Sequence, residues 1–209
     1  MINREAARRR GGAWTAPCIL WSLDFGELDA RKRTGSPERV YALFREAALG
    51  LEAAGAELLM LCANTPHRYA DRLEDLLSIP LVHIAVATAA AIRRRGMHRV
   101  GLLGTRITME EAFYHDRLAE AGIEALVPAE TERCFVDHAI FNELVNDEFK
   151  PETRRRFLEI MADLAARGAE GIVLGCTEIP LLVLPEHTDL VLFNTLEIHA
   201  KAAVAAALA

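Results

Sequence analysis

Short apolar runs alternate along the chain with longer stretches in which apolar residues recur every three to four positions. The runs predict β-strands and the stretches predict α-helices. Several runs are apolar throughout rather than at every second residue, which is typical of a parallel sheet covered on both faces. We therefore predict an α/β fold. The predicted strands are 18–23, 57–62, 80–84, 99–103, 123–127, 171–175 and 189–193, and the predicted helices are 2–10, 37–54, 67–77, 86–95, 109–121, 135–146, 152–167 and 195–208.

Two segments about half a chain apart resemble each other. "GAELLMLCANT" begins at Gly55 and "GAEGIVLGCTE" begins at Gly168, and each glycine stands where a predicted helix ends before a strand. Such a repeat predicts two similar α/β lobes, although the pattern also recurs by chance in α/β proteins. Ligands of open parallel sheets bind beyond the carboxyl ends of the strands, so we expect these two strand ends to share one cleft.

The charge balance narrows the classes of partner. The net charge is −6 and charged residues make up 26% of the 209, which argues against nucleic acid or an anionic membrane as the main partner. The basic run from Arg4 to Gly12 is interpreted as a solvated helix face. The apolar run "CILWSL" is too short for a signal core or a membrane span. We expect a cytoplasmic protein.

The four cysteines, Cys18, Cys62, Cys134 and Cys176, are far apart and form no CxxC pair. That spacing predicts neither a zinc site nor a disulfide framework. In a reducing compartment they are expected to be free thiols, and we predict that Cys18 and Cys134 are small buried apolar side chains. The seven histidines are scattered, none at the spacing of a helical metal pair, so no metal is expected.

Cys176 ends a predicted strand immediately before a predicted turn into a helix. The positive end of a helix dipole favours thiolate, so we expect a lowered pKa for this thiol. Gly175 permits close approach, and Thr177 supplies a hydroxyl and a backbone N–H. The other strand end offers the amide of Asn64 and the hydroxyl of Thr65, which together are suited to holding a carboxylate. A reactive thiol beside a bound acid can act as a base; a cysteine that is merely buried is the structural alternative.

The segments "ANTPH", "RVGLLGTRITMEEAFYHDRL", "RGAEGIVLGCTEIPLL" and "LFNTLEIHAKAAV" closely resemble the aspartate/glutamate racemase family of cofactor-independent amino-acid racemases. The resemblance extends over most of the chain. It implies two pseudo-symmetric lobes, each a mostly parallel sheet flanked by helices, with the active-site cleft between them. It also implies a homodimer, a small carboxylate or amino acid as ligand, no cofactor, and two acid/base residues on opposite faces of the substrate α-carbon.

Carried over residue by residue, the resemblance makes Cys176 the catalytic acid/base and Asn64, Thr65, Thr177 and Lys32 substrate-binding residues. It also expects Thr105 and Tyr114 to reach the cleft. The first lobe is expected to span 1–85 plus 190–209, lacking the family's first strand and its glycine-rich turn, and the second lobe to span 86–189.

The second acid/base position is occupied by Ala63, which has no proton to give or accept. A one-residue slip turns the neighbouring Cys62 to the opposite face of a strand, so we interpret Cys62 as a buried bystander unless a bulge re-aims it. Water or the hydroxyl of Thr65 are alternative proton relays. The resemblance also leaves two other functions open: a single-cysteine decarboxylase of the arylmalonate type, and a catalytically degenerate homologue that binds without turnover.

Overall fold

The computed structural model describes residues 1–33 and 35–209. The chain forms two compact units. Unit 1 consists of 1–60, 69–82 and 203–209, and unit 2 consists of 61–68 and 83–202. The predicted lobe boundaries stay a prediction. None of the helices in the described residues is both long and apolar enough to cross a membrane.

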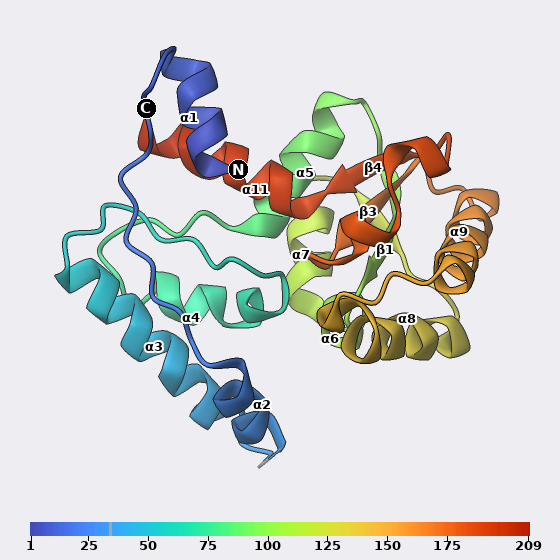
Figure 1. The fold of residues 1–209 in the computed structure, drawn as a ribbon, viewed down its shortest axis with the longest axis horizontal. Coiled ribbons are helices and arrows are strands. Elements are labelled where there is room, and N and C mark those ends of the chain that lie inside the picture. The colour runs from blue at the N-terminus through green and yellow to red at the C-terminus, as the bar shows by residue number, and fades with distance from the viewer. Residues whose placement is uncertain (34) are drawn as a thin grey trace. The chain divides into compact units, whose positions relative to one another are not determined.

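Unit 2 is built on a parallel sheet of four strands in the order β2-β1-β3-β4 (Figure 1). Its strands β1 (Arg99–Gly104), β2 (Glu124–Leu126), β3 (Gly171–Gly175) and β4 (Val191–Asn194) are those predicted from the last four apolar runs. Gly104 pairs with Gly175, and Leu174 pairs with Asn194. The carboxyl ends of these three strands therefore lie close together.

Both faces of this sheet are covered by helices, as the continuous apolar runs predicted. Leu103, Ile172 and Leu174 pack with residues of α8 (Glu130–Asn142) and α9 (Pro151–Ala166). Leu102, Val173 and Phe193 pack with residues of α5 (Ile84–Arg94) and α7 (Ala112–Glu120). Neighbouring strand residues thus serve opposite faces, and Figure 1 shows the two helix pairs on either side of the strands. The α/β fold is confirmed.

The remaining elements of the described chain are mostly short. Predicted helix 109–121 is divided into α6 and α7 because Glu111 has an extended backbone, with φ −87° and ψ 150°. Predicted helix 67–77 is likewise a 3-10 turn followed by one short helix. The bounds are α1 (Ile2–Arg10), α2 (Phe25–Arg33), α3 (Pro37–Ala53), η1 (Thr65–Tyr69), α4 (Ala70–Glu74), α6 (Arg106–Glu110), η2 (Leu144–Asn146), α10 (Ile179–Leu182), η3 (Pro185–His187) and α11 (Thr195–Ala207).

The first three predicted strands do not form. Of 57–62 and 80–84, only an isolated parallel bridge between Leu59 and Leu81 is present. Pro80 has no N–H to extend that ladder. Segment 18–23 has no strand pairing among the described residues, and Ile19 and Leu20 are 52% and 80% exposed. An apolar run becomes a strand only where a neighbouring strand is available to pair with it.

The helix ends of the internal repeat are alike in detail. Gly55 follows α3 with φ 91°, and Gly168 follows α9 with φ 99°. In both, the next N–H bonds back five residues, from Ala56 to Leu51 and from Ala169 to Leu164. This is the glycine-terminated helix end that the sequence predicted. The likeness stops there, because only the second copy continues into a strand.

Candidate active site

Polar side chains follow directly on three strands of the unit 2 sheet. Thr105 comes after β1, Cys176 after β3 and Thr195 after β4. Because the carboxyl ends of parallel strands lie on the same side of the sheet, these residues lie where open α/β sheets bind their ligands. Thr105 and Cys176 are each 9% exposed, and Thr195 is fully buried.

Two glycines allow β1 and β3 to end in close contact. A Cβ on Gly104 would lie 2.8 Å from the carbonyl oxygen of Gly175, and a Cβ on Gly175 would lie 2.8 Å from that of Leu103. These added Cβ atoms would also lie 3.1 Å (Gly104) and 3.2 Å (Gly175) from the side chain of Thr108. No larger residue fits without moving a strand, which is the close approach predicted for Gly175.

The thiol of Cys176 is held by a carboxylate two residues further along. Its Sγ donates a hydrogen bond to Glu178 Oε2 at 2.9 Å. Burial, followed by the negative charge of Glu178, raises the pKa of the Cys176 thiol. The expectation of a lowered pKa is therefore wrong. Backbone N–H groups of Thr177 and Glu178 act in the lowering direction, but α10 starts only at Ile179 and spans one turn, so its dipole does not outweigh burial.

Glu178 also binds the neighbouring threonine, since Thr177 Oγ1 donates to Glu178 Oε1 at 2.6 Å. One carboxylate thus accepts from both the thiol and the hydroxyl. Our interpretation of the sequence did not include Glu178 among the site residues. The signal was available in the motif "GCTE", which places an acid two positions after the cysteine.

Asn64 is joined to the strand ends by a chain of hydrogen bonds. Its Nδ2 donates to Thr195 Oγ1 at 3.1 Å, and Thr195 Oγ1 donates to the carbonyl oxygen of Leu174 at 2.8 Å. Asn64 is only 3% exposed, and its Oδ1 has no hydrogen-bond partner among the described residues. Among the described residues, then, one polar atom of this amide makes no hydrogen bond, and its role in ligand binding stays a prediction.

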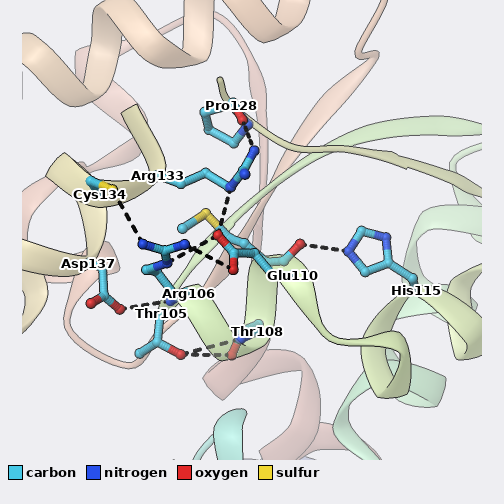
Figure 2. Close-up of polar contacts among 10 residues, drawn as sticks. Thr105, Arg106, Thr108, Glu110, His115, Pro128, Arg133, Cys134 and Asp137 are labelled. Atoms are coloured by element: carbon cyan, nitrogen blue, oxygen red, sulfur yellow. Dashed lines mark hydrogen bonds and ion pairs between the residues drawn. The ribbon is translucent and has the colours of Figure 1, made fainter. Parts of the chain in front are cut away.

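Thr65 is brought to the end of β1, where its Oγ1 lies 3.0 Å from Thr105 Oγ1. Thr105 is also the N-cap of α6 and lies 3.2 Å from Thr108 Oγ1. Figure 2 shows this turn: the N–H of Arg106 donates to Asp137 Oδ1 at 2.7 Å, which anchors the start of α6. Thr65 and Thr105 thus lie together at the end of β1, and the expectation that Thr105 reaches the cleft stays a prediction.

Tyr114 does not join it. The ring is fully buried in the core of unit 2, and its hydroxyl donates to Thr88 Oγ1 at 3.4 Å. Burial raises the pKa of this phenol. The expectation that Tyr114 reaches the cleft is wrong, because α7 turns this side chain towards α5 and the sheet.

A buried histidine holds the backbone beside Asn64. His67 Nδ1 lies 2.9 Å from the carbonyl oxygen of Ala63, and the N–H of Ile84 donates to His67 Nε2 at 3.1 Å. Since Nε2 accepts, Nδ1 carries the proton and the ring is neutral. Burial, and then the neighbouring rings of His83 and His199, lower the pKa of His67 to about 3. Sequence reasoning missed this residue, since an isolated histidine gives no signal of its partners.

The other cysteines are not buried. Cys18, Cys62 and Cys134 are all exposed, so the prediction that they are buried apolar side chains is wrong. Cys134 lies on α8, and Cys18 and Cys62 lie outside the helices and strands. The side chain of Lys32, on α2, lies outside the described residues. Whether Ala63 stands opposite Cys176 stays a prediction.

Comparison with known proteins identifies relatives in sequence and in fold. The chain shares 40% identity and a TM-score of 0.92 with a candidate Asp/Glu racemase from Yersinia pestis, covering 100% of this chain and 91% of that one. An aspartate racemase homologue from Pyrococcus horikoshii OT3 is 31% identical, with a TM-score of 0.85 and the same coverage.

The curated relatives are longer. Glutamate racemase of Geobacter metallireducens is 33% identical over 153 residues, which cover 71% of this chain and 54% of that enzyme. The chain thus matches little more than half the length of that relative. The Asp/Glu/Hydantoin racemase family matches residues 2–203. On that match, which includes every residue of the site described above, the chain belongs to the Asp/Glu/Hydantoin racemase family.

Proposed function

We propose that this protein is an isomerase that inverts the α-carbon of a small aspartate- or glutamate-like amino acid without a cofactor, with Cys176 as the acid/base. The observation that carries the proposal is the hydrogen bond from Cys176 Sγ to Glu178 at the end of β3. A thiol held by a carboxylate has a place to pass its proton, which a merely buried cysteine does not need.

In this mechanism Glu178 takes the proton of Cys176, and the thiolate then removes the α-proton of the substrate. The electron pair of the broken C–H bond stays on the α-carbon and spreads into the substrate carboxylate. The hydroxyls of Thr65 and Thr105 are donors suited to that carboxylate, and the hydroxyl of Thr177 joins them when it turns away from Glu178 Oε1, to which it donates in the structure. Return of a proton to the opposite face completes the inversion.

A two-base mechanism also requires an acid/base group on the opposite face of the substrate α-carbon. Ala63, at the predicted position of that group, has no atom that transfers a proton. We propose that water delivers the second proton, directly or through the hydroxyl of Thr65. Proton return is then slower than from a positioned thiol. The prediction is a slow racemase whose α-proton exchange outpaces its inversion.

A second candidate is decarboxylation of a malonate of the arylmalonate type. The raised pKa of Cys176 favours it, because a protonated thiol is a donor in its resting state. Loss of carbon dioxide leaves an electron pair on the α-carbon, and one proton from one face is all that the reaction then requires. The polar set Asn64, Thr65 and Thr105 suits an amino acid better than an aryl group, so this function ranks second.

The test is solvent exchange of the α-proton, followed by proton NMR in deuterated water with both enantiomers of aspartate and glutamate. Wild-type protein should exchange the α-proton, and Cys176→Ala should lower the rate by at least about 10²-fold, the usual share of one acid/base group. Cys134→Ala is the matched control, because this exposed thiol lies on α8. Cys62→Ala tests whether that cysteine supplies the second proton.

Three other results would point elsewhere. Absence of exchange with all four substrates would refute the racemase proposal for these acids. Release of carbon dioxide from an arylmalonate would select the decarboxylase. Calorimetric binding of an amino acid with no turnover would identify a binding homologue. A homodimer in the cytoplasm stays part of the proposal, and sedimentation of the purified protein tests its oligomeric state.

A further inference from the structure

Thr195 is a fully buried threonine whose hydroxyl both donates and accepts a hydrogen bond. It donates to the carbonyl oxygen of Leu174 at 2.8 Å and accepts from Asn64 at 3.1 Å. Leu174 is the second-last residue of β3, two positions before Cys176. The hydroxyl therefore connects the start of α11, strand β3 and the segment of Asn64, which lies 131 residues earlier in the chain.

The direction of these bonds determines how the Asn64 amide is turned. A carbonyl oxygen can only accept, so the single proton of the Thr195 hydroxyl must go to Leu174. The Thr195 oxygen can then only accept, and the atom that faces it must be the NH₂ group of Asn64. The Oδ1 atom of Asn64 is consequently turned away from Thr195, in a site where it has no partner among the described residues.

A buried carbonyl without a partner is costly and uncommon in proteins. It is explained if a ligand supplies the missing donor. An α-amino acid carries one strong donor, its ammonium group, whereas its carboxylates only accept and would be repelled by Oδ1. Resting on the proposed function, we infer that Thr195 is a positioning residue that turns Asn64 Oδ1 towards the substrate, so that the site selects acids bearing an α-ammonium group.

An Oδ1 atom that requires an ammonium donor distinguishes the two candidate functions. A malonate without an amino group offers Oδ1 no ammonium donor and leaves it unpaired. Removing the Thr195 hydroxyl frees the amide to rotate and present NH₂ instead. Selectivity for the amino group should then fall while carboxylate binding is preserved.

The experiment measures calorimetric binding of two ligand pairs, aspartate with succinate and glutamate with glutarate. Each pair differs only in the amino group. Thr195→Val should weaken aspartate or glutamate binding by about 10- to 100-fold, the range for one hydrogen bond to a charged group. Binding of succinate or glutarate should change by less than about threefold, and Thr195→Ser should restore the preference for the amino acid.

Thr88→Val is the matched control. Thr88 is also fully buried, donates to the carbonyl oxygen of Ile84 at 2.8 Å and accepts from Tyr114 at 3.4 Å, but it lies on α5 within the core. Thr88→Val loses an equivalent hydroxyl, but that hydroxyl bonds to Ile84 and Tyr114 and not to Asn64. The variant should therefore keep the preference for the amino acid. If it loses that preference to the same extent as Thr195→Val, the effect is only structural and the inference is overturned.

Three further results would overturn it. If Thr195→Val keeps the wild-type preference, the hydroxyl does not orient the amide, while α-proton exchange by wild type would leave the proposed function standing. If wild type binds both members of each pair equally well, Oδ1 does not receive an ammonium group. Failure of wild type to bind either pair would count against the proposed function as well, and the exchange assay identifies that case.

Discussion

The buried ring of His67 predicts a loss of stability in weak acid. The ring is 1% exposed and its pKa is lowered to about 3 from an ordinary 6.5. Between these two values the unfolded chain binds a proton that the folded chain does not. The free energy of unfolding is therefore unaffected by this group above pH 6.5 and falls as the pH drops through the window from 6.5 to 3.

The magnitude follows from the size of that pKa difference, at about 1.36 kcal/mol per unit. From pH 6.5 to pH 5 the loss is about 2 kcal/mol, and over the whole window it approaches about 5 kcal/mol. Native proteins are stable by about 5–15 kcal/mol in total, so the effect is large enough to measure. The rings of His83 and His199 lie 4.8 and 5.4 Å from that of His67, centre to centre, and add to the lowering of the His67 pKa.

The assay is urea unfolding at intervals from pH 7.5 to pH 5, comparing wild type with His67→Gln. Glutamine stays neutral, so the variant should be less stable at pH 7.5 yet lose about 2 kcal/mol less on acidification. His98→Gln is the control, because His98 is exposed on the surface. Equal slopes for wild type and His67→Gln, or an NMR titration of the His67 ring above pH 6, would refute the reasoning.

Three further changes test the site. Ala63→Cys places a thiol where the repeat predicts the second acid/base, so the rate of inversion, measured by polarimetry, should rise about 10-fold or more relative to the rate of α-proton exchange. An unchanged ratio of the two rates would mean that residue 63 does not face the substrate. Glu178→Gln removes the negative charge beside Cys176, so the pKa of the thiol should fall and iodoacetamide should alkylate Cys176 faster at pH 8. The rate of α-proton exchange should drop by about 10²-fold. Alkylation of Cys176 at the wild-type rate would contradict the expected fall in pKa. Gly175→Ala places a Cβ 2.8 Å from the Leu103 carbonyl oxygen, so the free energy of unfolding should fall by about 1–3 kcal/mol; an unchanged melting temperature would show that the strands can separate at no cost.

The sequence by itself determined the features that depend on local chemistry. Continuous apolar runs at 99–103 and 171–175 became central strands buried on both faces. Gly168 ended its helix because only glycine readily adopts the positive φ required there. The position of Cys176 directly after β3 also followed from the pattern, since the polar residues begin where the apolar run stops.

Only the tertiary structure decided which elements found partners. The apolar run 57–62 matches its repeat counterpart in composition, yet only Leu59 is bridged, because a strand depends on neighbours that are distant in sequence. The pKa of Cys176 rose because burial and a carboxylate outweighed the dipole of a one-turn helix. The orientation of Asn64 was decided by Thr195, which folding alone brings to it. Strand pairing, burial and hydrogen-bond direction are properties of the assembled chain, so no local pattern could specify them.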